Sequence, residues 1–241
     1  MGLPRYVAAR IVWAAVVSLI IVTITFVLMA AAPPILSSAA IAMLLGLDGA
    51  LAIVAGLAAT VLAPLTVPPL ALALLGLDLE ISLAVFMGRL AGIVAAAFAL
   101  ALAIRQLAPA GWLQRQQGRI DGFVVVLMLF FGVAIMDGVT ARLLAEPGLV
   151  LLWTAAAFVA NPALQALGML AFAWLGRRGA LTVGLITGNC NMGLLLAALP
   201  PGTDFDVLLY FAVAQLPIFM LPAVLLPLYR RLLAGTSAAT G

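Results

Sequence analysis

Long apolar segments run along almost the whole chain, separated only by short breaks of Pro, Gly or charged residues. A helix that crosses the hydrocarbon core of a membrane needs about 20 apolar residues. The pattern therefore predicts an all-α integral membrane protein with seven or eight transmembrane helices. The predicted segments lie near residues 11–32, 33–47, 49–75, 80–107, 121–144, 148–176, 178–200 and 206–233.

The composition agrees with this fold class and excludes several functions. Of the 241 residues, 67% are hydrophobic and 8% are charged, whereas soluble domains are about 25% charged. The chain has no His and one cysteine, Cys190, so it lacks the commonest zinc ligand and cannot form an internal disulfide. The net charge of +3 is too small for a nucleic-acid-binding surface. Without a catalytic or cofactor motif, we expect a lipid-embedded protein that is not an enzyme.

Arginines predict the orientation of the chain in the membrane. Basic residues in short loops favour the cytoplasmic side, and three groups of arginines agree on one orientation. This orientation puts the turn at Asp48 and the C-terminus in the cytoplasm. We expect a multi-pass protein of the inner (cytoplasmic) membrane, with one domain over 1–233 and a flexible tail over 234–241. The groups are Arg105, Arg115 and Arg119, then Arg177 and Arg178, then Arg230 and Arg231.

Polar and helix-breaking residues interrupt two of the apolar segments. Non-helical backbone at membrane depth is tolerated only where it is buried in protein or lines a wet cavity, and paired broken helices indicate a transporter site. We therefore expect two discontinuous helices that cross near the bilayer midplane. The expected breaks are Pro33, Pro34, Gly188 and Gly193, and the expected substrate-binding residues beside them are Ser38, Thr187, Asn189 and Asn191.

Two arrangements remain open for the first break. Proline removes a backbone donor and disfavours helix just before it, so the segment cannot continue unbroken. Either a long helix ends near Ala32 and a half-helix follows from Ser37 to Leu47, or one broken crossing runs over about 23–47 after a short stub. The number of crossings before Asp48 differs between the two arrangements.

The two breaks also belong to a weak internal repeat. Each is followed by a turn that contains Asp and then by a helix rich in proline. We expect a partial first repeat over about 1–75 and a second repeat over about 80–233. The two repeats are expected to be inverted relative to each other, an arrangement that is typical of transporters. The alternative interpretation is that the small residues and Asn at the breaks only pack helices together.

Several of these residues fall at the spacing of a known motif set. The first break reads Pro33 and Ser38, with Asp48 ten residues after the serine, and the next helix contains Ala-Pro-Leu-x-x-Pro at 63–68. The second break reads Gly-x-x-Asn-x-Gly at 188–193. In these features the chain resembles the bile acid:sodium symporter family over roughly 32–231, and it resembles auxin-efflux-type carriers more weakly. The resemblance implies secondary transport of a small organic anion by a fold with two inverted repeats.

The resemblance also implies a sodium site, but most of its ligands are replaced. Only Ser38 keeps a side-chain oxygen suitable for sodium, and a hard cation needs several oxygen ligands. We therefore expect transport without sodium coupling and no other cofactor. The positions implied by register are Ser38, Ala39, Ala52, Gly56, Ile186 and Cys190.

A second function class is kept open by the length of the resemblance. Members of the family are similar in having ten helices, and two or three N-terminal helices have no counterpart in this chain. The alternative function is a truncated, non-transporting remnant or subunit of such a transporter. A dimer or a partner subunit is compatible with either function.

Arg89 is a further candidate for substrate binding. It lies about a third of the way into the segment that begins near Glu80, and a charge at membrane depth costs at least about 2.5–3.5 kcal/mol. One interpretation is contact with an anionic substrate, since a guanidinium is suited to carboxylates. The other is that the side chain extends to the membrane surface.

Overall fold

The computed structural model describes residues 19, 23, 26–27, 29–75, 82–199 and 205–234. Every named element within these residues is a helix, so the all-α prediction is confirmed for this part of the chain. The helices are α2 (Ser38–Leu44), α3 (Gly49–Leu75), α4 (Leu83–Leu107), α5 (Trp112–Ile135), α6 (Val139–Ala145), α7 (Pro147–Ala171), the 3-10 helix η1 (Ala173–Leu175), α8 (Gly176–Gly188), α9 (Met192–Ala198) and α10 (Phe205–Ala234).

Five helices in the described ranges are long and apolar enough to cross a membrane. The chain is therefore a multi-pass membrane protein. The predicted total of seven or eight crossings stays a prediction, because α8 and α9 form a broken segment and much of 1–28 lies outside the described residues, as does most of the tail. The five spans are Gly49–Ala73, Leu83–Leu107, Trp112–Ala145, Pro147–Ala171 and Val207–Ala234.

The boundaries of one predicted segment are wrong. We expected a helix over 121–144, but α5 already begins at Trp112 and a separate short helix, α6, follows it. Gln and Arg are good helix formers, so the polar stretch before residue 121 continues the helix instead of forming a loop. Gly111 and Gly138, with φ of 72° and 74°, occupy the left-handed region at the two ends of α5, which glycine adopts at little cost.

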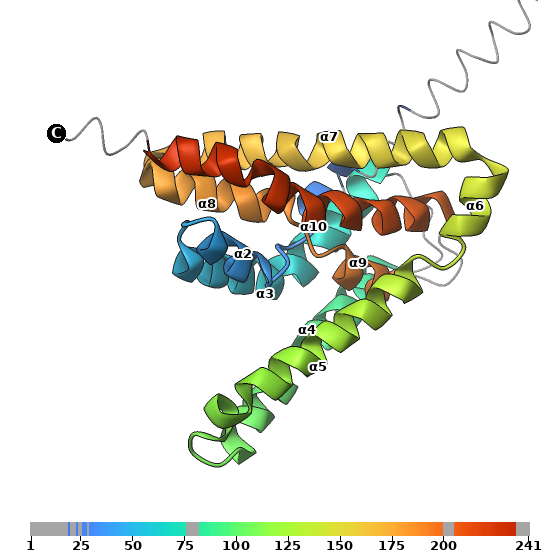
Figure 1. The fold of residues 1–241 in the computed structure, drawn as a ribbon. Coiled ribbons are helices and arrows are strands. Elements are labelled where there is room, and N and C mark those ends of the chain that lie inside the picture. The colour runs from blue at the N-terminus through green and yellow to red at the C-terminus, as the bar shows by residue number, and fades with distance from the viewer. Residues whose placement is uncertain are drawn as a thin grey trace, which may run out of the picture.

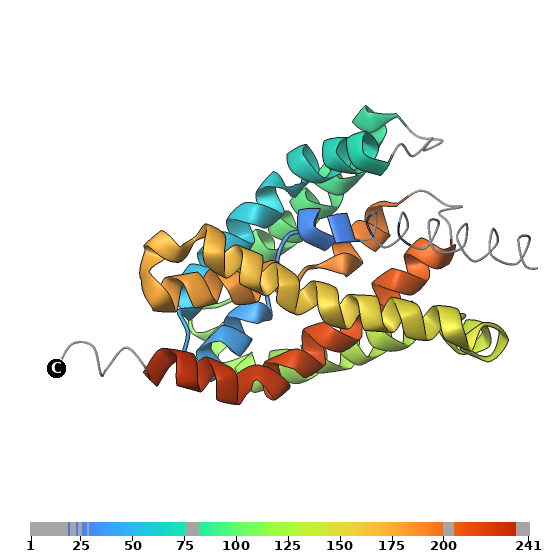
Figure 2. The same ribbon diagram turned by 90° about the horizontal axis from the view of Figure 1, so that it is seen from above.

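The helices form one packed body with a diverging arm. Helices α7, α8 and α10 lie side by side, while α2 and α3 pack beneath α8 (Figure 1). Helix α4 packs on α3 and α9. Seen from above, α4 and α5 diverge from their connecting turn (Figure 2), and Figure 1 shows α5 extending away from the body. The 18-residue apolar window of α5 and α6 has no residue buried inside the described protein.

Two clusters of buried apolar side chains hold the body together. The larger cluster surrounds the rings of Trp153 and Tyr210, which lie edge to face with centroids 5.7 Å apart. The smaller cluster joins α2, α3, α8 and α10. Its buried members are Ala39, Ala42, Leu45, Leu47, Ala52, Leu181, Leu185, Ile186 and Tyr229.

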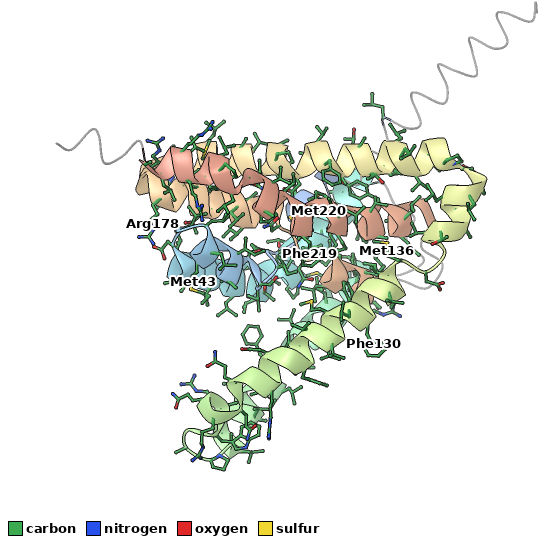
Figure 3. The ribbon with its side chains drawn as sticks, in the orientation of Figure 1. Met43, Phe130, Met136, Arg178, Phe219 and Met220 are labelled. Carbon is green, nitrogen blue, oxygen red and sulfur yellow. The ribbon has the colours of Figure 1, made fainter. Side chains whose placement is uncertain are left out.

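Three polar turns meet at one end of the body. The guanidinium of Arg178 donates to the carbonyl oxygen of Leu47 at 3.1 Å, and the N–H of Asp48 donates to the hydroxyl of Thr182 at 3.0 Å. Arg178 and the end of α10 lie at this same end (Figure 3). The arginine pattern requires the Asp48 turn, the start of α8 and the end of α10 to share one side of the membrane, and the structure brings them together. That this side is cytoplasmic stays a prediction.

Glycines allow α7 and α8 to approach each other closely. A Cβ atom added at Gly184 would lie 2.6 Å from the carbonyl oxygen of Gln165, and one added at Gly188 would lie 2.7 Å from the carbonyl oxygen of Asn161. The two glycines are four residues apart and share one face of α8. Close packing through small residues is a principal source of stability between helices in lipid.

This packing predicts that Gly184→Ala will destabilise the protein. The added methyl group meets backbone, which cannot rotate away, so α7 and α8 must separate at an expected cost of about 1–3 kcal/mol. Gly122→Ala on α5 is the matched control, because no atom lies within 4 Å of its added Cβ. Alanine there should stabilise the helix by about 0.5–1 kcal/mol. Thermal unfolding in detergent will measure both, and an unchanged midpoint for Gly184→Ala would refute the close packing.

Candidate functional site

The two predicted breaks lie against each other. Helical residues 29–31 end just before Pro33, and a new helix begins at Ser38. Across the gap, the N–H of Ile35 donates to the carbonyl oxygen of Asn189 at 2.8 Å, and the N–H of Asn191 donates to the carbonyl oxygen of Pro33 at 2.7 Å. The pair forms an antiparallel bridge centred on Pro34 and Cys190. The prediction that these segments lie side by side is confirmed, and their depth in the bilayer stays a prediction.

The paired breaks compensate for the hydrogen bonds that each helix loses. Proline has no N–H to donate, and the residues between two helices cannot continue either helical ladder. A buried backbone group without a partner is costly, and more so in hydrocarbon. Each break supplies the donor or acceptor that the other requires. We call this paired region, residues 33–38 and 188–193, the crossing.

Three of the four predicted break residues occupy the interruptions, and one does not. Pro33 and Pro34 lie between the two helical segments, and Gly188 is the last residue of α8. Gly193 lies instead in the first turn of α9. It makes room for α5, since a Cβ there would come within 2.8 Å of the ring of Phe131. Gly193 therefore allows the ring of Phe131 to approach α9 closely and does not interrupt the helix.

Asn191 joins the crossing to a cavity. Its side-chain oxygen accepts a hydrogen bond from the N–H of Leu194 at 3.1 Å and so caps α9. The side chain is half-buried and lines the cavity beside it. This arrangement uses the oxygen of the amide to cap the helix.

The cavity lies between the crossing, α5 and α10 and has a volume of about 440 Å³. Most of its lining is apolar and none of its lining residues is charged. Phe219 lies on α10 above it, whereas Phe130 points away from the body on the outer side of α5 (Figure 3). The lining residues are Ile35, Leu36, Ser37, Val124, Leu127, Met128, Phe131, Cys190, Asn191, Met192, Gly193, Gln215 and Phe219.

Two predicted binding residues lie buried inside the crossing. Ser38 is 1% exposed and Asn189 is 0% exposed. The hydroxyl of Ser38 and the side-chain nitrogen of Asn189 have no hydrogen-bond partner within the described residues. Polar atoms in this state are rare in folded proteins, so a ligand or water is expected to satisfy them.

The other two predicted binding residues lie elsewhere. The hydroxyl of Thr187 donates to the carbonyl oxygen of Val183 one turn earlier, and its side chain packs where Gly168 of α7 leaves space. Arg89 is exposed on α4 and is not among the residues that line the cavity. The structure thus brings Ser38, Asn189 and Asn191 together at the crossing, and of the five predicted binding residues only Asn191 lines the cavity.

Sequence reasoning missed three polar residues near the crossing. Gln165 and Tyr229 join Asn161 in a chain of buried hydrogen bonds that ends at Gly188 and Asn189. Gln215 is buried and lines the cavity. The available signal for Gln165 was its spacing of four residues from Asn161, which puts both side chains on one face of α7.

The positions where the resemblance implies sodium ligands are apolar in the structure. Ala39, Ala52 and Ile186 are buried together in the smaller apolar cluster. Ser38 is the exception, with an oxygen but without the acidic or amide oxygens that would complete a site. The described residues also contain no group of three or more His, Cys, Asp or Glu side chains that could hold a metal ion. The side chains at the implied positions therefore offer sodium a single oxygen, that of Ser38, and the absence of sodium coupling stays a prediction.

No protein-family model matches the chain, and no curated protein matches it either. The functional argument therefore rests on the crossing, the cavity and the buried polar groups.

Proposed function

We propose that the chain is a secondary transporter that carries a small organic anion without sodium coupling. The main observation that supports this proposal is the hydrogen-bonded crossing of two interrupted helices beside a cavity. Such crossings concentrate polar groups inside an apolar protein, and transporters use them to bind substrate between two halves that can rock. The motif resemblance to the bile acid:sodium symporter family supports the same function.

The proposed substrate class follows from the polar groups that remain available. Asn189 offers N–H donors, Ser38 offers a hydroxyl, and Asn191 lines the cavity. Hydrogen bonds from neutral donors to an anionic acceptor are stronger than those between neutral groups, so a carboxylate can be held without a cationic side chain. Arg89 lies outside the cavity lining, and we assign it no contact with substrate in this conformation.

The inverted-repeat fold belongs to the same proposal. The two hydrogen bonds around Pro34 and Cys190 relate the breaks by a local twofold arrangement. Helix α3 follows the first break and contains Pro64, Pro68 and Pro69, and α10 follows the second and contains three prolines as well. The two broken segments and the five long helices make seven crossings, and a separate crossing over 11–32 would make eight. Two inverted repeats of these crossings are the proposed architecture.

Sodium replacement tests the proposed absence of coupling. Because alanine and isoleucine side chains fill the implied sodium positions, they cannot supply the oxygens that a hard cation needs. Proteoliposomes in which choline replaces external sodium should take up a transported acid at an unchanged initial rate. A strict sodium requirement would contradict the proposal.

Substitution of Asn191 tests the cavity face of the crossing. Asn191→Asp keeps the volume and the capping oxygen of α9 but replaces the N–H donors by an oxygen. It should insert and express normally yet lose uptake, because a carboxylate there repels an anionic substrate. Asn191→Leu removes both the cap and the donors and should also abolish uptake, with a further loss of about 1 kcal/mol of stability from the missing cap.

Uptake of labelled pyruvate, succinate, benzoate and cholate by reconstituted protein provides the measurement for both variants. The matched control is Gln114→Glu, which makes the same amide-to-acid change on the exposed start of α5. Equal uptake by wild type, Asn191→Asp and Asn191→Leu for every acid would remove the case for this site.

A non-transporting subunit or remnant is the second candidate function. The observation that favours it is the surface of α5, which is apolar and almost wholly exposed within the described protein. A partner helix could cover this surface as well as lipid could. Absence of uptake by the wild type for every acid, together with co-purification of a second membrane chain, would favour this candidate.

A further inference from the structure

A continuous line of hydrogen bonds runs from α10 through α7 to the second break. The hydroxyl of Tyr229 donates to Oε1 of Gln165 at 2.6 Å, and Nε2 of Gln165 donates to Oδ1 of Asn161 at 2.6 Å. Nδ2 of Asn161 then donates to the carbonyl oxygen of Gly188 at 2.7 Å and to Oδ1 of Asn189 at 3.3 Å. We call Tyr229, Gln165 and Asn161 the amide relay.

The backbone carbonyl of Gly188 fixes the direction of every bond in the amide relay. A carbonyl oxygen can only accept, so the atom of Asn161 that faces it must be the nitrogen. The oxygen of Asn161 must then face Gln165, which has to donate, and the oxygen of Gln165 must face Tyr229. No amide in this line can be reversed without placing two acceptors or two donors against each other.

The same reasoning fixes the orientation of Asn189. The nitrogen of Asn161 faces its side chain, so Asn189 must present its oxygen there and turn its nitrogen the other way. That nitrogen is buried and has no partner within the described residues. Ser38, with a buried and equally unpartnered hydroxyl, belongs to the same crossing, because Ile35 accepts from the N–H of Ser38 and donates to the carbonyl oxygen of Asn189.

We propose that the amide relay is a set of positioning residues that holds Asn189 with its N–H donors toward the crossing, where they and the Ser38 hydroxyl bind an oxygen acceptor and not a cation. The acceptor is a carboxylate oxygen of the transported anion or an ordered water. The proposal deepens the proposed function and rests on it for the transported molecule. The relay itself requires no transport.

A cation is disfavoured by the donors themselves. Two N–H groups place partial positive charge at the site, and the amide oxygen of Asn189 is turned away from it toward Asn161, from which it accepts a hydrogen bond. Of the implied sodium positions, Ser38 alone supplies a side-chain oxygen, because Ala39 and Ile186 are apolar and buried. An acceptor instead pairs with both the Asn189 nitrogen and the Ser38 hydroxyl, which the described structure leaves without partners.

The composition of the chain makes a direct test possible. It contains three asparagines, Asn161, Asn189 and Asn191, and all lie at or beside the crossing. Selective ¹⁵N labelling of asparagine therefore gives three side-chain amide signals in the NMR spectrum of the full chain in detergent. Asn189→Asp and Asn191→Asp each remove one signal and so assign all three.

The relay arm of the experiment uses Tyr229→Phe. Loss of the hydroxyl should shift the amide signals of Asn161 and Asn189 and leave that of Asn191 in place. Tyr210→Phe is the matched control, since its buried hydroxyl contacts Sδ of Met29 at 3.5 Å and is not part of the relay. Gln165→Met is a second variant that should shift the same two signals. Equal shifts in the control, shifts of all three signals, or no shifts would overturn the relay.

The ligand arm compares benzoate, sodium chloride and choline chloride. Benzoate should move the Asn189 amide protons downfield, whereas sodium should give the same spectrum as choline. If benzoate has no effect but the Asn189 protons show cross-peaks to water, the acceptor is water and donor orientation still holds. An Asn189 signal that responds to sodium, or that has the shift of a free amide, would overturn the proposal.

The two proposals fail in distinguishable ways. Asn189→Asp exchanges the donors for oxygens, so in this variant the neighbouring Asn161 amide signal should respond to sodium and not to benzoate. If reconstituted protein transports no acid but the relay shifts are observed, the proposed function fails and the positioning of Asn189 stands. If acids are transported but Tyr229→Phe leaves every amide signal unchanged, the function stands and the relay fails.

Discussion

Two backbone hydrogen bonds at the crossing are the constraint on which the rest of the structure depends. The N–H groups of Ile35 and Asn191 reach across to the carbonyl oxygens of Asn189 and Pro33. In lipid, leaving one of these groups without a partner would cost several kcal/mol of folding free energy. An interruption in one helix is therefore stable only when the other helix is interrupted beside it. Once the two breaks are paired, the side chains next to them must share one place inside the protein.

The crossing has two different sides because the helices around it pack differently. On the α7 side, Gly184 and Gly188 allow close approach, and the amide relay fills the contact with hydrogen bonds. On the α5 side, the main close contact is Phe131 against Gly193, and a cavity remains. The closely packed α7 side of the crossing and its open α5 side thus meet at Asn189 and Asn191. Sparse packing is typical of elements that move, so α5 is better suited to motion than α7 or α8.

The sequence predicted the crossing but not the network that supports it. Consecutive prolines and a Gly-Asn-Cys-Asn stretch cannot form a regular helix interior, and membrane physics requires two such breaks to be sheltered. Gln165 and Tyr229 carry no such local signal, because each is a single polar residue in an apolar helix and they lie 64 positions apart. The start of α5 is hidden for the opposite reason: its residues are polar but are good helix formers, so the helix begins before the apolar segment does.

The smaller apolar cluster occupies positions where the motif resemblance implies sodium ligands. Ala39, Ala52 and Ile186 do converge beside the crossing, as the resemblance implies, but they converge as a dry cluster packed on Tyr229. The ring of Tyr229 belongs to this cluster while its hydroxyl begins the amide relay. Tyr229 therefore contributes both to the apolar packing at the implied sodium positions and to the fixed orientation of the Asn189 donors. Because the relay ends in N–H groups, the polarity of the site is set by the direction of its hydrogen bonds and requires no charged side chain.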